Sequence, residues 1–102
     1  MEYRSDVYIK VHKSDEDKLV NILIENGFSF IKEYSSITYV GYVIDDVEWY
    51  SDYDEVKAVN DFIKERGNYH RGLIAIGEDN DIEEHGEPSE VGFFTVTKIV
   101  WK

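Results

Sequence analysis

The sequence predicts an α+β fold, and three observations indicate it. Apolar side chains alternate with a period of two in some segments and recur at helical spacing in others. The predicted elements follow the order strand, helix, strand, strand, helix, strand, strand. This order is typical of a ferredoxin-like βαββαβ sandwich, with both helices on one face of the sheet and one extra C-terminal strand. The 102 residues, 42% of them hydrophobic, suffice for a single domain over residues 1–102 with one core.

The first strand and the first helix are predicted near the beginning of the chain. Residues Val7–His12 alternate apolar and polar side chains, which is typical of a half-buried strand. A helix is expected from Ser14 onward, with Ser14 as its cap and Asp17 at the third helical position. Gly27 stands where a residue in the left-handed conformation would end this helix.

Two aromatic and β-branched runs follow, over Phe28–Tyr34 and Ile37–Ile44, and only Ser35 and Ser36 lie between them. We expect a β-hairpin there, because two strand-like runs joined by two residues are typical of one. The hairpin supplies the second and third strands of the predicted sheet.

A second helix is expected after this hairpin. Ser51 or Asp52 can cap it, and Asp52 and Glu55 have the spacing of a capping box. Apolar side chains recur at helical spacing after Glu55, and Gly67 is expected to end the helix.

The last third of the chain is predicted to hold two strands separated by a long loop. Leu73–Ile76 forms a short apolar strand that ends at Gly77, and Val91–Trp101 forms the last strand. The 13 residues Glu78–Glu90 between them carry seven acidic side chains and no Lys or Arg. Because like charges repel, we expect this segment to be an exposed, mobile loop unless Arg4, Arg71 or a cation ties it down.

Acidic residues are concentrated in two segments of the chain. The chain has 22 Asp and Glu against 11 Lys and Arg, which gives a net charge of −11. Asp45–Glu55 holds six of these acids and Glu78–Glu90 holds seven. The two segments would follow the third and fourth strands, which we expect to run in opposite directions. The acidic segments are then expected at opposite ends of the sheet unless the long loop folds back, so the sequence does not predict one continuous acidic surface.

Three interpretations of these acids remain open. Exposed carboxylates keep a small domain soluble. Carboxylates interleaved with aromatic side chains can also form a docking surface for a basic partner, or imitate the phosphates of a nucleic acid. Finally, Asp79–His85 offers oxygen ligands and one imidazole to a divalent cation, although it lacks the ligand spacing and the glycine of a Ca²⁺ loop.

The composition argues against several other classes of function. The chain has no cysteine, which removes disulfides, a thiolate nucleophile and cysteine-based zinc sites. Its negative charge opposes direct binding to a nucleic-acid backbone or an anionic membrane. The charged start, Met1–Asp6, is not expected to be a signal peptide. His12, His70 and His85 do not have metal-binding spacing. We therefore expect a cytoplasmic protein without catalytic residues, metal or cofactor.

Three further residues have competing interpretations. Arg71 precedes the fourth predicted strand and is expected to pair with Asp6 or with a loop carboxylate, because arginine can hold a carboxylate bidentately. Trp49 is expected either to pack beneath the second helix or to be an exposed anchor for a partner. Asp45 and its neighbour Asp46 are expected to point to opposite faces of a strand, which prevents both from serving one site.

Three stretches of the sequence resemble a group of small, acidic bacteriophage and prophage proteins. They are Tyr3–Val7, then Val47–Ala58, then Ile76–His85. The pattern of that group reads roughly YRSDV, then I-x-W-Y-x-x-Y-x-D-V, then R-I-G-E-x-x-D-D-I-E-E-H. In this chain Ala75 replaces the arginine of the last block and Asn80 replaces its first aspartate.

The resemblance implies a phage genomic setting and does not imply a reaction. It also directs attention to the residues that match the pattern. These are Arg4, Asp6, Trp49, Tyr50, Asp54, Gly77, Glu78, Asp81 and Glu84.

Together, the charge and the resemblance predict a non-catalytic, phage-encoded binding protein. We expect it to block a basic, nucleic-acid-binding host protein, such as a defence effector, as a monomer or a homodimer. The alternatives are an immunity protein or antitoxin for a basic nuclease, and a structural or oligomer-forming phage component. The residues expected to bind the partner are Asp45, Asp46, Glu48, Trp49, Tyr50, Asp52, Tyr53, Asp54, Glu55, Glu78, Asp79, Asp81, Glu83 and Glu84.

Overall fold

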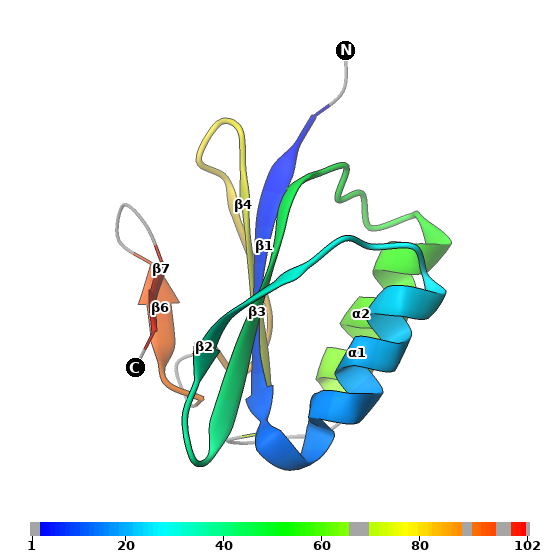
Figure 1. Ribbon diagram of the computed structural model, residues 1–102. Coiled ribbons are helices and arrows are strands. Elements are labelled where there is room, and N and C mark those ends of the chain that lie inside the picture. Colours follow the sequence, from blue (N-terminus) through cyan, green and yellow to red (C-terminus); the bar gives the residue numbers. More distant parts are fainter. Residues whose placement is uncertain (1–2, 66–69, 89–90, 96–98, 102) are drawn as a thin grey trace.

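A five-stranded antiparallel sheet forms the centre of the protein, with the strand order β2-β3-β1-β4-β5. The computed structural model describes residues 3–65, 70–88, 91–95 and 99–101. Two helices cover one face of the sheet, and a C-terminal pair of strands lies on the other side (Figure 1). The predicted α+β class, with both helices on one face, is confirmed.

The order of the elements along the chain agrees with the prediction as far as the fourth strand. A short 3-10 turn, Lys13–Asp15, separates the first strand from the first helix. The elements are β1 Ser5–His12, α1 Glu16–Glu25, β2 Ile31–Ser35, β3 Tyr39–Val47, α2 Asp54–Glu65, β4 Arg71–Gly77, β5 Ile82–Gly86, β6 Phe93–Thr95 and β7 Ile99–Trp101.

The directions of β3 and β4 decide where the acidic segments lie. β1 is antiparallel to both of its neighbours, β3 and β4. These two strands therefore run in the same direction, and the segments that follow them leave the sheet at the same end. The prediction that Asp45–Glu55 and Glu78–Glu90 lie at opposite ends is wrong, because it gave opposite directions to two strands that share an antiparallel neighbour.

The acidic segment Glu78–Glu90 is not a loop, which corrects a second prediction. Its central part forms β5, which pairs with β4 along its whole length. The turn before β5 contains Asn80 with φ of 65°, a conformation that asparagine adopts more readily than most residues. The backbone ladder with β4 holds this segment in place, and the His85 imidazole contacts the Glu83 carboxylate at 2.5 Å. Residues 89–90 lie outside the described part of the chain.

The predicted last strand, Val91–Trp101, consists of two short strands instead of one. β6 and β7 pair with each other in a separate two-stranded antiparallel sheet. Residues 96–98, which the prediction placed inside one strand, lie outside the described residues. Val91 and Trp101 belong to a small apolar cluster with Ile74, on the face of the main sheet opposite the helices. The C-terminal strands therefore help to cover that face.

The first helix begins one residue later than predicted. Ser14 lies in the 3-10 turn, and Asp15 occupies the N-cap position of α1 without a capping hydrogen bond from its side chain. The Asp15 carboxylate binds Arg71 instead, at 3.0 Å. The helix ends before Gly27, whose φ of 79° confirms the predicted left-handed position.

The second helix begins at Asp54, just after the predicted caps Ser51 and Asp52. A turn leads into it, in which the backbone N–H of Tyr53 donates to the carbonyl of Tyr50 at 3.0 Å. Gly67, which was predicted to end this helix, lies outside the described residues. Within the described part of the chain, neither helix has the length and apolar character needed to cross a membrane.

The main core lies between the sheet and the two helices. Burial of each aliphatic side chain there contributes about 1.5–3 kcal/mol to folding. Its fully buried members are Val7, Ile9 and Val11 of β1, Leu19 and Leu23 of α1, Val40 of β3, Val56, Val59 and Ile63 of α2, and Leu73 of β4.

Lys10 is fully buried on the opposite face of the sheet, among groups that come from distant parts of the chain. Its Nζ donates to the carbonyl of Gly92 at 3.2 Å. The same atom lies 4.5 Å from the centre of the Tyr34 ring and 5.2 Å from that of Tyr39. Burial lowers the pKa of Lys10, and the cation–π contacts offset part of this cost of desolvation.

Candidate binding surface at the acidic end of the sheet

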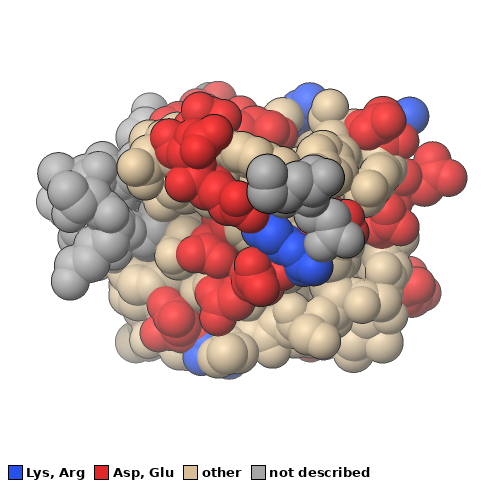
Figure 2. Space-filling model, turned by 90° about the horizontal axis from the view of Figure 1, so that it is seen from above, with Lys and Arg blue, Asp and Glu red and all other residues tan. Residues whose placement is uncertain are grey.

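The two acidic segments meet at the end of the sheet where β1 begins and where β3 and β4 end. Viewed onto this end, acidic side chains cover much of the surface (Figure 2). We call this surface the acidic end. It consists of Asp6, Asp45, Asp46, Glu48, Asp52, Asp54, Glu55, Glu78, Asp79 and Asp81 together with Tyr3, Arg4, Tyr50 and Tyr53.

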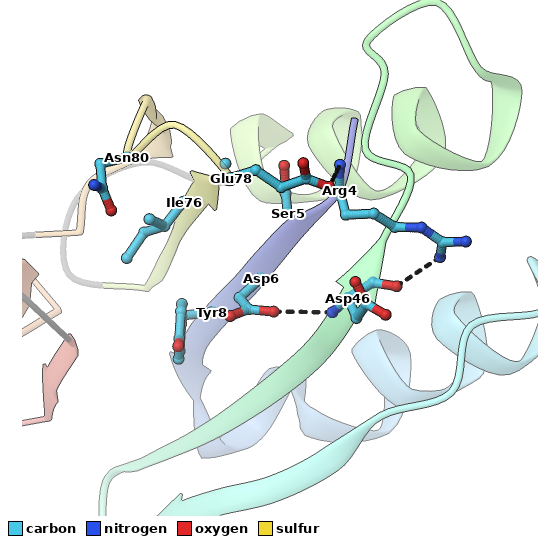
Figure 3. A pocket seen from close by; sticks show the side chains of 9 residues that line it. Arg4, Ser5, Asp6, Tyr8, Asp46, Ile76, Glu78 and Asn80 are labelled. Atoms are coloured by element: carbon cyan, nitrogen blue, oxygen red, sulfur yellow. Dashed lines mark hydrogen bonds between the residues drawn. The ribbon is translucent and has the colours of Figure 1, made fainter. Parts of the chain in front are cut away.

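Arg4 connects the end of β3 with the turn between β4 and β5. Its guanidinium Nη1 donates to the backbone carbonyl of Asp46 at 2.8 Å (Figure 3). The backbone N–H of Arg4 donates to Oε1 of Glu78 at 2.8 Å. In return, the N–H of Glu78 donates to the carbonyl of Arg4 at 3.0 Å. Arg4 therefore holds parts of both acidic segments in a fixed relation.

Tyr3 makes a second connection between the same segments. Its backbone N–H donates to the hydroxyl of Tyr50 at 2.7 Å. Its own hydroxyl donates to Oδ2 of Asp81 at 2.8 Å, and this hydrogen bond raises the pKa of the Tyr3 phenol. The ring packs closely on Gly77, where a Cβ atom would clash with it. Glycine at this position therefore allows the amino-terminal segment to approach β4.

A bulge near the end of β3 brings two aspartates close to a third. The register between β1 and β3 shifts between Ser5 and Val7, so that Asp45 and Asp46 together lie opposite Asp6. The N–H of Asp46, which has φ of 51°, donates to Oδ1 of Asp6 at 2.9 Å (Figure 3). The prediction of opposite faces for the two neighbours assumed a regular strand, and the bulge removes that assumption.

A cavity of about 350 Å³ opens beside this bulge, on the face of the sheet opposite the helices. Arg4, Asp6, Glu78, Tyr8 and Ile76 are among the residues that line it, and Figure 3 shows the guanidinium of Arg4 turned toward Asp46, away from Tyr8 and Ile76. Partial burial raises the pKa of the Tyr8 phenol, and nearby carboxylates raise it further. The cavity therefore lies in a region of negative potential.

The aromatic residues predicted to bind a partner differ in their exposure. Trp49 is only 6% exposed, and its ring centre lies 5.6 Å from that of Phe28 in the core. The structure therefore excludes Trp49 as an exposed anchor and agrees with the alternative of a core residue. Tyr53 is 37% exposed, and its ring contacts that of half-buried Tyr50 edge-on at 5.1 Å. Tyr53 is thus more exposed than Tyr50 at the acidic end.

Glu83 and Glu84, also predicted to bind a partner, lie on β5 rather than in the turn before it. Glu83 contacts His85, and Glu84 is exposed. The hydrogen bonds of Tyr3 and Arg4 were not predicted. The signal that pointed to this segment was the Tyr3–Val7 motif.

Arg71 lies at the opposite end of the sheet, where β4 begins. Its Nε donates to Oδ2 of Asp15 at 3.0 Å, and both side chains are buried. Its Nη1 donates to the backbone carbonyl of Phe62, and the guanidinium lies 3.8 Å from the centre of the Phe62 ring. The predicted pairing of Arg71 with a carboxylate is confirmed, but the partner is Asp15 and not Asp6, because the turn into α1 places Asp15 beside the start of β4.

No group of three or more His, Asp or Glu side chains suited to a metal ion occurs within residues 3–65, 70–88, 91–95 and 99–101. In the segment Asp79–His85, the imidazole contacts Glu83 and the carboxylate of Asp81 accepts a hydrogen bond from Tyr3. Two of the side chains that were considered as metal ligands, His85 and Asp81, are therefore engaged in contacts within the protein.

Comparison of the chain with protein-family models, with curated proteins and with solved structures gave no match. The resemblance to phage proteins therefore rests on the three sequence motifs alone.

Proposed function

We propose that this protein is a non-catalytic binding protein that uses its acidic end to occupy a basic, nucleic-acid-binding surface of a bacterial host protein. The observation that carries this proposal is the meeting of Asp45–Glu55 and Glu78–Asp81 at one end of the sheet. Two distant segments thereby form one negatively charged surface. Such a surface attracts a basic partner and speeds its association.

The hydrogen bonds within the acidic end favour binding over solubility alone. Carboxylates that serve only solubility do not need fixed positions. Here Asp6, Glu78 and Asp81 each accept a hydrogen bond from another part of the same surface. Side chains that are held in place before binding lose less conformational entropy when a partner binds. Fixed carboxylates can also imitate the spacing of nucleic-acid phosphates.

The motif resemblance supports a phage origin, and a host defence effector in the bacterial cytoplasm is then the target that we propose. An immunity protein or antitoxin for a basic nuclease would use the same surface, and a toxin gene beside this one would favour it. A stable homo-oligomer in solution would favour a structural phage component.

The strand order supports a finer description of the fold. β2, β3, β1 and β4 are adjacent in that order, and all neighbouring pairs are antiparallel. We propose that they form a ferredoxin-like βαββαβ unit, to which β5 adds as the extra strand.

Charge reversal tests the proposed function. After affinity capture of a partner from a bacterial lysate, surface plasmon resonance measures its binding to wild type and to a variant with Asp52, Asp54 and Glu55 replaced by Lys. We expect the variant to associate roughly 10-fold more slowly at low salt, with a weaker salt dependence. Association as fast as wild type at every salt concentration would reject the proposal.

A matched pair of single substitutions controls for the change in net charge. Asp54 stands in the first turn of α2 at the acidic end, and Asp17 stands in the first turn of α1 at the opposite end. We expect Asp54→Lys to slow association more than Asp17→Lys, although both change the net charge equally. Equal effects would show that total charge matters and the position of the carboxylate does not.

A further inference from the structure

β5 forms one edge of the main sheet, with β4 as its neighbour. The two strands pair residue by residue, from Ile82 to Gly86, in a regular antiparallel ladder. An edge strand presents backbone N–H and C=O groups on its outer side, and another strand can add to them.

Two backbone hydrogen bonds show which groups of β5 face outward. The carbonyl of Asp81 accepts a hydrogen bond from β4 at 2.8 Å, and the N–H of Glu87 donates to β4 at 3.0 Å. Because bonded residues alternate along an antiparallel ladder, the odd-numbered residues between them also bond to β4. The N–H and C=O of Ile82 and Glu84 therefore point outward. In the part of the chain that the structure describes, these outward groups have no backbone partner.

The side chains along this edge differ between its two faces. Ile82 and Glu84 lie on the face of the C-terminal strands, and Ile82 is 50% exposed. Glu83 and His85 lie on the helix face, where a hollow of about 240 Å³ is lined by Glu83 and Asp81. An added strand would meet Ile82 and the carboxylate of Glu84 on one face, and the carboxylate of Glu83 with His85 on the other. It would fit best with alternating apolar and cationic side chains.

The other edge of the sheet, β2, is less suited to pairing. Its register shifts between Lys32 and Tyr34, which leaves Glu33 as an extra residue in the strand. Lys32 forms an ion pair with Glu16 at 2.8 Å, and Glu33 accepts a hydrogen bond from Trp101 at 3.4 Å. Bulges and charged side chains on an edge discourage strand addition. The mixed charges of β2 also give no preference for a basic segment.

We propose that an extended basic segment of the partner adds to β5 as an antiparallel strand. The occupant follows from charge, since β5 and the turn before it carry carboxylates and one imidazole but no Lys or Arg. A second copy of this chain, with a net charge of −11, would be repelled from that edge. The inference rests on the proposed function and specifies what the partner contributes.

A synthetic peptide with the sequence VKVKVK, acetylated and amidated at its ends, serves as the probe. The peptide is titrated into ¹⁵N-labelled protein. We expect the NMR signals of the Ile82 and Glu84 amides to shift, and these amides to exchange hydrogen more slowly. The amides of β2 should not respond. Two further peptides carry backbone N-methyl groups on every valine or on every lysine, which leaves their charge unchanged and blocks opposite edges of the peptide strand.

In antiparallel pairing, the peptide residues that bond to β5 have side chains on the same face as Ile82 and Glu84. We assign the valines to this face, and we expect valine methylation to weaken binding roughly 10-fold while lysine methylation has little effect. The opposite selectivity would still support strand addition and would indicate the other orientation of the peptide. Equal binding of all three peptides, or no binding at low salt, would overturn the proposal.

A matched pair of variants tests the same point from the side of the protein. Glu84→Pro and Glu84→Thr both remove the carboxylate, but only proline removes the outward N–H, and proline is tolerated at such a position of an edge strand. We expect Glu84→Pro to bind the peptide roughly 10-fold more weakly than Glu84→Thr. Equal affinities of the two folded variants would overturn the proposal. If circular dichroism shows that Glu84→Pro is unfolded, the N-methylated peptides decide alone.

The outcomes separate this inference from the proposed function. Salt-dependent binding of all three peptides with equal affinity would reject strand addition and leave attraction to the acidic end intact. Unchanged association after reversal of Asp52, Asp54 and Glu55 would reject the proposed function itself.

Discussion

The two ends of the sheet hold their arginines in opposite ways. Arg71 is completely buried and shares its environment with one buried carboxylate, that of Asp15. Arg4 is only half-buried, and it lines two hollows together with five acidic residues, which are Asp6, Asp46, Glu48, Glu55 and Glu78. At the end of the sheet where Arg71 lies, the positive and the negative charge pair with each other away from water, and this pair stabilises the fold. At the acidic end an excess of negative charge is held at the surface, where it is available to a partner.

Removing each arginine would test this difference most strongly. Arg71→Ala leaves the Asp15 carboxylate buried without its partner, and we expect a loss of about 3–5 kcal/mol in the free energy of unfolding. Arg4→Ala removes one hydrogen bond to the Asp46 carbonyl, and we expect a loss of about 0.5–1.5 kcal/mol. Urea denaturation followed by circular dichroism measures both. Similar losses for the two variants would contradict the comparison.

A matched substitution of aspartates gives the second-largest expected effect. Asp15→Asn keeps the shape of the side chain but leaves Arg71 as an unpaired buried cation, and we expect a loss of about 2–4 kcal/mol. Asp79→Asn makes the same chemical change at an exposed position of the acidic end, and we expect a change within about 0.5 kcal/mol. The same denaturation experiment compares them. A large loss for Asp79→Asn would show that the acidic end also serves the fold.

The smallest expected effect concerns the pH dependence of stability. It involves Glu16, which begins α1 at the same end of the sheet as Arg71. The ion pair with Lys32 and the hydrogen bond from Tyr42 hold the pKa of Glu16 below its ordinary value. The stability that this carboxylate contributes is therefore present above its unfolded pKa of about 4.3 and is lost as pH falls through the lower folded pKa.

The variant Glu16→Gln isolates this contribution. We expect it to lower the free energy of unfolding at pH 7 by less than about 1 kcal/mol, because the pair is partly exposed and screened. The difference from wild type should shrink as pH falls below about 4.3. Thermal denaturation over a range of pH measures it. A difference that grows toward acid pH would contradict the assigned direction of the pKa shift.

Sequence patterns were sufficient for the elements that depend on local chemistry. Gly27 marked the end of α1, and alternating apolar residues marked β1. β5 was not predicted, because an edge strand does not need a row of buried apolar side chains. The acidic residues Glu83 and Glu84 were therefore assigned to an exposed loop. The pairing of β5 depends on β4, which a local pattern does not reveal.

The two ends of the sheet were harder to predict, because they depend on contacts between distant residues. Arg71 and Asp15 are 56 positions apart, and no local spacing relates them. The meeting of the acidic segments depends on the directions of β3 and β4, which follow from their shared neighbour β1. The motif around Arg4 was visible in the sequence, but its hydrogen bonds to Asp46 and Glu78 were not.

The position of Tyr3 and Arg4 determines how the protein can be labelled or immobilised. Both residues belong to the acidic end, so a tag, fluorophore or fused domain attached just before them would stand beside the surface that we propose for binding. A polyhistidine tag there would also be attracted to the carboxylates when protonated. Trp101 packs against Gly41 near the start of β3, well away from that end. An attachment at the carboxyl terminus therefore leaves the acidic end open to solution.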